Sequence, residues 1–589
     1  MDAPQKNKLD LYLLRRVLGL ASPYKLTFTL AAVLAVVLAP LATLRPYLVK
    51  IMVDDYIFAN DLSGLTYMAL LLTLLLFLES ALRYVFIYST NLLGQCVVRD
   101  LRVRVFRHIT GLRLSYFDKT PIGTSTTRTI NDIEAINTVF SQGSITIIAD
   151  LLTVVTVLVV MFITSWKLTL ISLTTMPLLI VASYIFKEKV KVSFQQVRAE
   201  ISRMNAFLQE RISGMRVVQI FNAEKQEMER FKKINREYTK ANLDSILYYA
   251  VFFPVVEIIA AFSLGLMVWW GAQDALQAGG VTLGALVAFP IYLDMLFRPI
   301  RTVANNFNTL QMGLVASERV FSVLDLNDRI ENGGQFKKDK LEGSVVFDQV
   351  YFAYNEEEFV LKNVSFDISP GETLAIVGST GSGKTTIINL INRFYDIQKG
   401  SIQLDGHDLR EYELEALRNR IAIVLQDVFL FSGSVFENIT LRDNRFSREE
   451  VIQAAKMIGA HEFIEKLPGG YDYKVMERGA TLSMGQRQLI SFVRALVFDP
   501  DILILDEATS SIDPETESVI QYAIEKLIAK RTSIIIAHRL STIRHANNIL
   551  VLHKGEVQEF GTHDELLQME DGRYKQLYEM QFLQIAGED

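Results

Sequence analysis

The 589-residue sequence predicts a multi-domain membrane protein in which a bundle of membrane-crossing helices precedes an α/β domain. Three observations support this fold class. A chain of this length exceeds the roughly 250–300 residues at which single hydrophobic cores stop growing. Long apolar runs with few charges crowd the first half of the chain. From Val345 onward, short β-branched runs alternate with helical segments, as expected of an α/β domain.

The overall composition narrows the function classes. Half of the residues are hydrophobic, the net charge is −6 and Cys96 is the single cysteine. Such a charge argues against a nucleic-acid surface, which is normally basic, and one cysteine cannot form an internal disulfide. Residues 1–24 carry basic side chains around a short apolar stretch and show no small-residue cleavage site. They predict an amphipathic cytoplasmic helix on the membrane surface rather than a removable signal peptide.

Six segments are long enough to cross the roughly 30 Å hydrocarbon core of a bilayer, which takes about 20 residues. They lie near residues 25–47, 65–91, 143–164, 167–187, 246–270 and 281–303. The stretches 92–142 and 188–245 are rich in Arg and Lys, whereas the short connections on the opposite side, near Asp54–Gly64, Thr164–Trp166 and Gly271–Gly280, contain neither. The positive-inside rule therefore places both stretches and both termini in the cytoplasm.

The two basic stretches keep helical apolar spacing, so they predict long cytoplasmic extensions of the membrane helices. Two breaks interrupt them, at Tyr116–Gly123 and near Ile212–Met215, where Gly or Pro lets the chain reverse. These tips are candidate contacts with the second domain.

Several charged residues fall inside the predicted spans, among them Glu79, Arg83, Glu257 and Asp294. A charge in lipid is costly, so each should face a partner or a watery cavity. Glu79 and Arg83 are four residues apart on one helical face and predict a local ion pair. Two interpretations stay open for Glu257 and Asp294. They line a translocation cavity that favours cationic substrates, or they pair with other helices of the bundle.

A phosphate-binding loop (P-loop) follows the predicted strand Thr373–Val377 and precedes a helix. It comprises Gly378, Ser379, Thr380, Gly381, Ser382, Gly383, Lys384, Thr385 and Thr386. The glycines let backbone N–H groups wrap phosphates, while Lys384 reaches the β and γ phosphates and the Thr385 hydroxyl is placed to bind Mg²⁺.

Two further strand ends carry candidate catalytic groups. The strand Ile502–Leu505 ends in Asp506 and Glu507, and the strand Ser533–Ala537 ends at His538. In a P-loop site Asp506 would hold Mg²⁺ through its hydration shell, and Glu507 would polarise the attacking water. His538 would contact the γ-phosphate or order Glu507. Taken alone, each has a plainer interpretation as a solvated acid or a structural histidine, but their positions after the P-loop favour catalysis.

These motifs resemble those of ATP-binding cassette (ABC) exporter halves of the lipid and multidrug type, over nearly the whole chain. Leu482–Gln486 reads Leu-Ser-Met-Gly-Gln and resembles the family signature, normally Leu-Ser-Gly-Gly-Gln, although a helix cap can show the same string. The resemblance implies that Ser483, Gly485 and Gln486 close over a nucleotide held by the P-loop of a second half.

The resemblance also implies roles for three residues outside these strings. Gln426 would sense Mg²⁺ and the coupling tips, Tyr354 would stack on adenine, and Asp513 would lie in the loop joining the two sites. Tyr351 is a rival to Tyr354, because stacking needs only a flat ring.

The chain is then expected to hold an N-terminal segment (1–24), a transmembrane domain (25–325), a linker (326–342) and an ABC ATP-binding domain (343–589). The implied function is export or flipping of drugs or lipids across the cytoplasmic membrane, driven by ATP hydrolysis with Mg²⁺. An ATP-gated channel or regulator, an importer and a peptide exporter are rival functions, and the six spans argue against a soluble ATPase.

Met484 departs from the family pattern, since the signature usually has Gly there and a side chain could crowd the γ-phosphate. In heterodimers of this family, one chain commonly keeps its P-loop, Glu and His but has a degraded signature. Its partner is a complementary chain. This pattern favours a heterodimer. The alternative is a homodimer that tolerates Met, because Ser483 and Gly485 remain.

Overall fold

The computed structural model describes residues 11–277, 280–330, 334–355, 358–506, 514–536 and 543–586. The chain divides into two compact units. One, here called the helical unit, comprises Met1–Gly111 and Thr120–Asn327. The other, the α/β unit, comprises Leu112–Lys119 and Asp328–Asp589. A short piece of the N-terminal half therefore belongs to the C-terminal unit.

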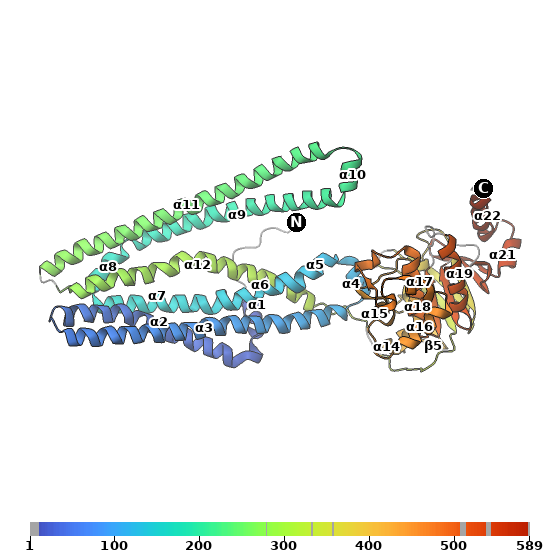
Figure 1. The fold of residues 1–589 in the computed structure, drawn as a ribbon, viewed down its shortest axis with the longest axis horizontal. Coiled ribbons are helices and arrows are strands. Elements are labelled where there is room, and N and C mark those ends of the chain that lie inside the picture. Colours follow the sequence, from blue (N-terminus) through green and yellow to red (C-terminus); the bar gives the residue numbers. More distant parts are fainter. Residues whose placement is uncertain are drawn as a thin grey trace. The chain divides into compact units, whose positions relative to one another are not determined.

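The helical unit consists of long helices joined by tight connections (Figure 1). Its α-helices are α1 (Leu11–Gly19), α2 (Lys25–Ile51), α3 (Leu62–Thr110), α5 (Ile122–Thr127), α6 (Ile133–Thr138), α7 (Ser144–Thr164), α8 (Trp166–Leu173), α9 (Met176–Ser213), α10 (Met215–Ile220), α11 (Glu224–Leu276) and α12 (Leu283–Leu324). Short π-helical segments join α5, α6 and α7 into one continuous run.

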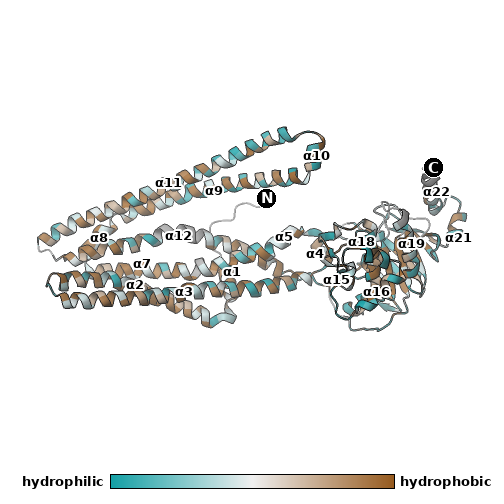
Figure 2. Cartoon of the chain, viewed as in Figure 1, coloured by the Kyte–Doolittle hydropathy of each residue, from teal (hydrophilic) through white to brown (hydrophobic). Residues whose placement is uncertain are grey.

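Five helices of the described chain are long and apolar enough to cross a membrane. They are Ser22–Ile57, Leu62–Thr110, Ile122–Thr164, Trp166–Ser213 and Glu224–Leu276. Each contains one of the first five predicted segments. The sixth segment lies largely in α12, where the side chains of residues 300–308 are outside the description, so this span stays a prediction. Figure 2 shows hydrophobic colour on the parts of α9 and α11 near α8, with more polar colour toward α10.

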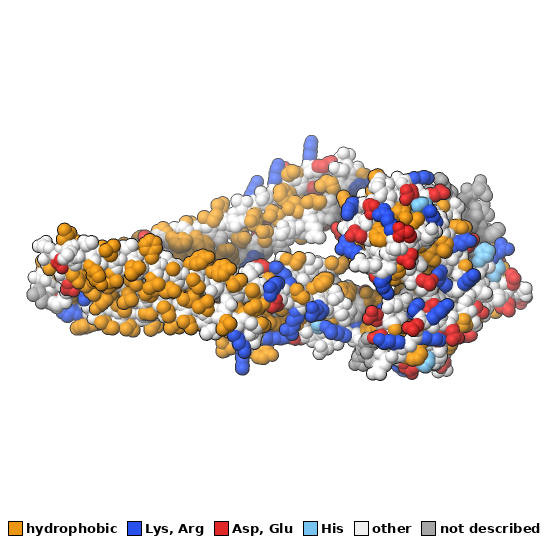
Figure 3. Space-filling view, turned by 60° about the horizontal axis from the view of Figure 1, so that its bottom comes forward, with side chains coloured by type: hydrophobic (Ala, Val, Ile, Leu, Met, Phe, Trp, Pro, Cys, Tyr) orange, Lys and Arg blue, Asp and Glu red, His pale blue; other side chains and the backbone are white. Residues whose placement is uncertain are grey.

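The predicted extensions beyond the bilayer are confirmed by the lengths of these helices. The helices α3 and α11 contain 49 and 53 residues. At 1.5 Å per residue they are roughly 74–80 Å long, more than twice the hydrocarbon thickness. Figure 3 shows Lys and Arg side chains gathering where the broad hydrophobic surface of the helical unit ends.

Both predicted breaks are present. The chain leaves α3 after Thr110, forms α4 (Leu114–Lys119) in the α/β unit and returns at α5. The second break lies at Gly214, after which α10 leads to a further reversal at Asn222, whose φ is +48°. Figure 1 shows α9 and α11 side by side, with α10 joining their ends.

Charged residues inside the predicted spans differ in their surroundings. Arg83 Nη2 lies 2.8 Å from Glu79 Oε1, which confirms the predicted ion pair. Glu257 and Asp294 are exposed side chains of α11 and α12. The two interpretations of these acids therefore stay open.

The α/β unit is built on a large sheet with strand order β12-β11-β3-β10-β9-β6 and a smaller sheet with order β2-β1-β4-β5, within the described residues. The strands are β1 (Val345–Phe352), β2 (Leu361–Ile368), β3 (Thr373–Val377), β4 (Lys399–Leu404), β5 (His407–Asp408), β6 (Ile421–Val424), β7 (Gly433–Ser434), β8 (Lys474–Val475), β9 (Ile502–Asp506), β10 (Thr532–Ile536), β11 (Asn548–His553) and β12 (Glu556–Gly561). The strands β7 and β8 form a separate pair.

Besides α4, the helices of this unit surround the sheets. They are α13 (Lys384–Ile391), α14 (Leu414–Arg418), α15 (Val435–Thr440), α16 (Arg448–Met457), α17 (His461–Lys466), α18 (Met484–Val497), α19 (Pro514–Ile528), α21 (His563–Gln568) and α22 (Arg573–Ala586). Successive residues of the central strands enter two different hydrophobic cores. Leu503 packs with α16, α18 and α19, whereas Ile504 packs with α13 and the smaller sheet. Burial on both faces explains why these strands read as continuous apolar runs.

The five strands β6, β9, β10, β3 and β11 run parallel. Their register pairs Ile376 with Ile536, Ile536 with Asp506, and Leu505 with Val424. Because parallel strands end at the same sheet edge, the loops that follow them converge there. That edge positions the candidate site.

Candidate nucleotide-binding site

The P-loop leaves the carboxyl end of β3 and turns directly into α13. Gly383 is the residue before α13 and has a φ of +106°, a conformation that favours glycine. A Cβ on Gly383 would lie 2.6 Å from Leu361 Cδ2, so the Leu361 side chain would have to shift to admit a side chain there. The free N–H groups of the first turn of α13 are therefore presented at the loop, an arrangement that suits an anion.

Lys384, the first residue of α13, lies folded against its own loop. Its Nζ donates to the carbonyl oxygens of Gly378 at 2.8 Å and Ser379 at 3.1 Å. Burial lowers the pKa of Lys384, while the nearby Asp506 carboxylate opposes that shift. A buried cation beside an acidic strand end is placed to attract phosphate oxygens.

Other polar groups of the loop fit a polyphosphate. The Ser382 side chain is only 2% exposed, and its Oγ has no hydrogen-bond partner. A buried hydroxyl without a partner is costly, so a phosphate oxygen there would satisfy it. A Cβ on Gly381 would meet open space, and Thr385 is exposed in the first turn. The loop thus has both donors and room for the predicted nucleotide.

The parallel register brings other predicted residues to the same edge. Asp506 is the last residue of β9, and Gln426 follows β6 by two residues with an exposed side chain. Glu507, Asp513 and His538 lie outside the described residues, so their roles stay predictions. Glu507 directly follows Asp506 in sequence, and His538 comes two residues after β10, which lies between β3 and β9.

The two aromatic candidates for adenine stacking have different neighbours. The Tyr354 hydroxyl lies 3.2 Å from Thr386 Oγ1 of α13, and the ring is 40% exposed. Tyr351 instead packs edge-on against Phe359, with Lys399 Nζ 5.8 Å from its ring centre. The structure therefore brings Tyr354 to the P-loop helix, and stacking on a base stays its predicted role.

The signature-like segment forms a helix cap at the start of α18. Ser483 Oγ accepts from Gln486 N at 3.2 Å, and Gln486 Oε1 accepts from Ser483 N at 3.0 Å. This reciprocal pair is a capping box, so both residues have a structural role whatever else they contact. Gly485 is buried, and the Ser483 side chain is exposed.

Met484 is half-buried at the first position of α18 and lines a cavity of about 140 Å³. The same cavity is lined by Gln426, Arg478 and Arg487. Within this chain, Met484 therefore lies near the segment that follows β6. That the Met484 side chain also crowds the γ-phosphate of a nucleotide held by a second chain stays a prediction.

Several residues with notable contacts, in both units, belong to no motif that the sequence analysis recognised. Tyr395 lies edge-on to Tyr354, with ring centres 5.1 Å apart. Arg494 of α18 donates to Asn438 O at 2.9 Å, and burial lowers its pKa. In the helical unit, Asp150 of α7 interacts electrostatically with Arg298 of α12. Listing every charged residue in the predicted spans would have found Asp150 and Arg298, because both residues lie inside those spans.

Comparison with known proteins identifies the family. Residues 28–300 match the family described as the ABC transporter transmembrane region, and residues 361–510 match the family described as ABC transporter. The ABC transporter ATP-binding protein YknV of Bacillus subtilis is 40% identical over 576 residues, which cover 96% of this chain and 94% of YknV. The chain belongs to the ABC transporter family.

Two more relatives align along nearly their whole length. An ATP-dependent lipid A-core flippase of Desulfotalea psychrophila is 38% identical over 95% of this ABC transporter chain and 97% of its own. The ATP-binding/permease protein YgaD of Bacillus subtilis, which is named for multidrug export, is 36% identical over 97% and 99%. The chain is therefore a multi-pass membrane protein with an ATP-binding domain, and couples ATPase activity to transport. With one region of each kind it is an ABC half-transporter, a kind of chain that generally dimerises.

Proposed function

We propose that this chain is one half of a dimeric exporter in the cytoplasmic membrane that uses ATP hydrolysis to move or flip drugs or lipids. The observation that supports this most is the end-to-end alignment with a lipid A-core flippase and with YgaD. Both relatives combine, as this chain does, a transmembrane region with an ATP-binding domain. The domain limits inferred from sequence, including the linker 326–342, belong to this proposal.

Catalysis is proposed to take place at the edge where β3, β6, β9 and β10 end. Thr385, Gln426 and Asp506 are the residues that would hold Mg²⁺, directly or through its water. When bound, the ion would neutralise charge developing on the phosphates. Lys384 would bind the phosphate oxygens, and Glu507 would accept the proton of the attacking water. His538 would orient Glu507 or contact the terminal phosphate.

A partner chain is supported by the surface around α10. The apolar residues Ile212, Val217, Ile220 and Phe221 there have exposed side chains, with Phe221 75% exposed. A cluster of exposed apolar residues beyond the membrane-spanning part of α9 and α11 is typical of an interaction site. The proposed dimer would cover this tip and complete each ATP site with the partner's signature segment.

Transport in sealed inside-out vesicles tests the proposed function. We expect ATP with Mg²⁺ to drive uptake of a cationic amphipathic dye, or flipping of a fluorescent phospholipid, against its concentration gradient. A channel gated by ATP would only let the probe equilibrate. Uphill movement therefore supports the exporter, and equilibration without accumulation would support the channel instead. Stimulation of ATPase activity across a panel of lipids and cationic drugs would then narrow the substrate class.

The heterodimer proposal predicts slow ATP turnover by the purified chain alone, because both of its ATP sites would then contain Met484. Replacing Met484 with Gly should raise this turnover. Misplacement by 1 Å can cost about 100-fold in rate, so we expect kcat of the Met484→Gly chain to rise by about tenfold. Steady-state ATPase assays of the reconstituted chain measure this change.

A matched control is Met457→Gly, because Met457 is an exposed methionine at the end of α16. This substitution should leave kcat unchanged. Robust turnover by the unmodified chain alone would contradict the heterodimer and favour the homodimer that tolerates Met484.

A further inference from the structure

The chain passes between the helical unit and the α/β unit at three places, after Gly111, after Lys119 and after Asn327. The first and third crossings are held together inside the α/β unit. The Arg113 backbone N–H donates to Asp328 O at 3.0 Å, and Arg113 Nε lies 3.5 Å from Asp328 Oδ1. Ser115 Oγ donates to Asp328 Oδ2 at 2.9 Å. Two stretches of chain far apart in sequence thus meet at their entry into this unit.

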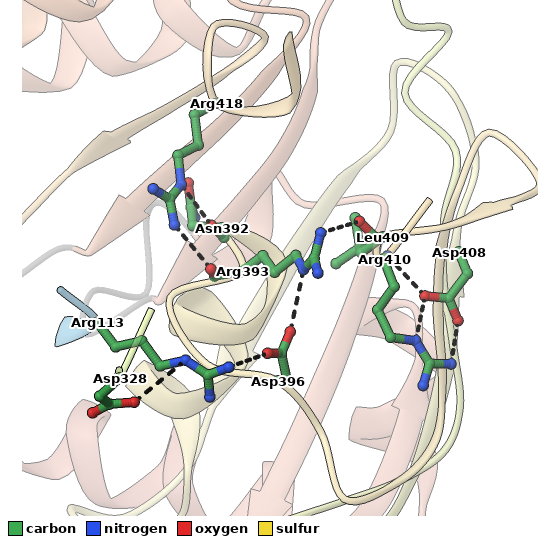
Figure 4. A network of polar contacts seen from close by, with 9 residues as sticks. All are labelled: Arg113, Asp328, Asn392, Arg393, Asp396, Asp408, Leu409, Arg410 and Arg418. Carbon is green, nitrogen blue, oxygen red and sulfur yellow. Dashed lines mark hydrogen bonds and ion pairs between the residues drawn. The ribbon is translucent and has the colours of Figure 1, made fainter. Parts of the chain in front are cut away.

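The same guanidinium also reaches the body of the α/β unit. Arg113 Nη2 lies 3.2 Å from Asp396 Oδ2, and the other oxygen of Asp396 accepts from Arg393 Nε at 3.2 Å (Figure 4). Asp396 is therefore a carboxylate shared by two arginines. The Arg393 side chain is only 6% exposed, and its Nη1 donates to Leu409 O at 3.3 Å. Arg393 is the fixed end of the network.

This fixed end directly follows the P-loop helix. Arg393 comes two residues after α13, which begins at Lys384. Arg418 donates to Asn392 O at 3.2 Å and to Arg393 O at 2.9 Å. Burial lowers the pKa of Arg418, and the charge of Arg393 adds to this shift. The carboxyl end of the phosphate-binding helix is thus tied by charged groups to Asp396, and through Asp396 to Arg113.

A second contact joins α4 to Tyr395, which packs against the candidate adenine-stacking residue Tyr354. The Tyr395 hydroxyl donates to Asp118 Oδ2 of α4. The Tyr395 ring also meets the Tyr354 ring edge-on. Tyr395 and Asp396, two and three residues after Arg393, therefore both contact the segment Leu112–Lys119.

Within the helical unit, the segments that precede the first and third crossings are also joined to each other. His108 Nε2 of α3 lies 3.0 Å from Leu326 O, just beyond the end of α12. Arg16 of α1 donates to the two carboxylate oxygens of Asp325 at 2.7 and 2.5 Å. The ends of α3 and α12 are therefore joined both before and after the chain enters the α/β unit.

We propose that Arg113 is a positioning residue in a junction clamp made of Arg113, Asp328, Asp396 and Arg393. The clamp makes the first and third crossings move as one body with the carboxyl end of the P-loop helix. A displacement of α13 on nucleotide binding then reaches α3 and α12 together. This role rests on the proposed ATP-driven function and assigns to Arg113 the coupling between the two units rather than hydrolysis.

The distribution of tryptophan provides a probe that needs no known substrate. The chain has three tryptophans, Trp166, Trp269 and Trp270, and all belong to the helical unit. A change in tryptophan emission on adding ATP therefore reports a response of the helical unit to a ligand of the α/β unit. The full-length chain in lipid nanodiscs would be compared with its variants. Binding of a fluorescent ATP analogue and basal ATPase activity would be measured on the same samples.

For Arg113→Gln we expect nucleotide affinity and basal kcat within about twofold of the unmodified chain, with an ATP-induced tryptophan response about tenfold smaller. Coupling between sites typically changes equilibria by about 5- to 150-fold, so this loss is within reach of one contact. Arg113→Lys keeps the charge but not the forked geometry and should recover part of the response. The double variant R113D/D328R restores one arm of the clamp and should also recover part.

The matched control is Arg410→Gln. Arg410 pairs with Asp408 through two bonds of 2.8 and 2.6 Å in the same region, and the Asp396 carboxylate acts on it as a nearby charge, so the variant also controls for the loss of a positive charge beside the clamp. Its loss should leave the tryptophan response unchanged. A full response in Arg113→Gln, or an equal loss in Arg410→Gln, would overturn the clamp, as would an unmodified chain that binds ATP without any tryptophan response. Failure of the proposed function is a separate result, since the unmodified chain would then neither bind nor hydrolyse ATP.

Discussion

Replacing Glu507 with Gln is expected to abolish ATP turnover while leaving ATP binding intact. The amide has nearly the shape of the carboxylate but cannot accept the proton of the attacking water. General-base catalysis typically contributes about 10²- to 10⁴-fold, so kcat should fall by at least about 100-fold. Steady-state ATPase assays measure the rate, and equilibrium binding of a fluorescent ATP analogue measures the affinity.

The matched control for Glu507 is Glu525→Gln, because Glu525 is an exposed acid of α19 in the same unit. It should hydrolyse ATP at the unmodified rate. Retained turnover in Glu507→Gln would remove Glu507 from its proposed role. Loss of binding together with turnover would show instead that the residue holds the fold or the nucleotide.

Replacing Lys384 with Ala is the second change with a large expected effect, here on nucleotide affinity. The residue supplies a buried positive charge at the loop, and its Nζ already lies within hydrogen-bond distance of two loop carbonyls. Hydrogen bonds to charged groups contribute about 1.5–3 kcal/mol, which corresponds to roughly 10- to 150-fold in the dissociation constant. Titration with a fluorescent ATP analogue measures this change.

Lys384→Arg should also bind ATP poorly, because a planar guanidinium does not fit a space shaped for a compact ammonium. The control is Lys362→Ala, which removes an exposed lysine of β2. Its affinity for ATP should not change. If Lys384→Ala binds ATP as tightly as the unmodified chain, the loop does not hold the phosphates in the proposed way.

Local sequence spacing was enough to predict the P-loop between a strand and a helix, which β3 and α13 confirm. Gly383 and Lys384 are adjacent in sequence. The loop that contains them can be recognised from its own residues together with the strand before it and the helix after it. The predicted strands 373–377, 502–505 and 533–537 correspond to β3, β9 and β10, which pair in parallel. Buried parallel strands have strong apolar patterns, which is why their ends could be found without a structure.

Contacts between distant segments could not be predicted in this way. Ser115 and Asp328 are 213 residues apart, and nothing in either local sequence indicates the other. The choice between Tyr351 and Tyr354 likewise depended on which ring lies near α13, because both are flat aromatic side chains close together in sequence. The run from α5 to α7 was predicted as a helical extension, but its π-helical segments were not, since they disturb the 3.6-residue period on which the prediction relied.

The position of α4 within the α/β unit has a consequence for biosynthesis. Asp118 and Tyr395 are separated by 277 residues, so the ribosome releases α4 long before the surface it packs against exists. Domains generally fold in order of synthesis, yet this contact can form only after the later membrane segments have been inserted. A fragment that begins at Asp328 would lack α4 altogether and would leave Tyr395 and Asp396 without these partners. The later-made part of the α/β unit therefore completes a contact whose first half, α4, is made long before it.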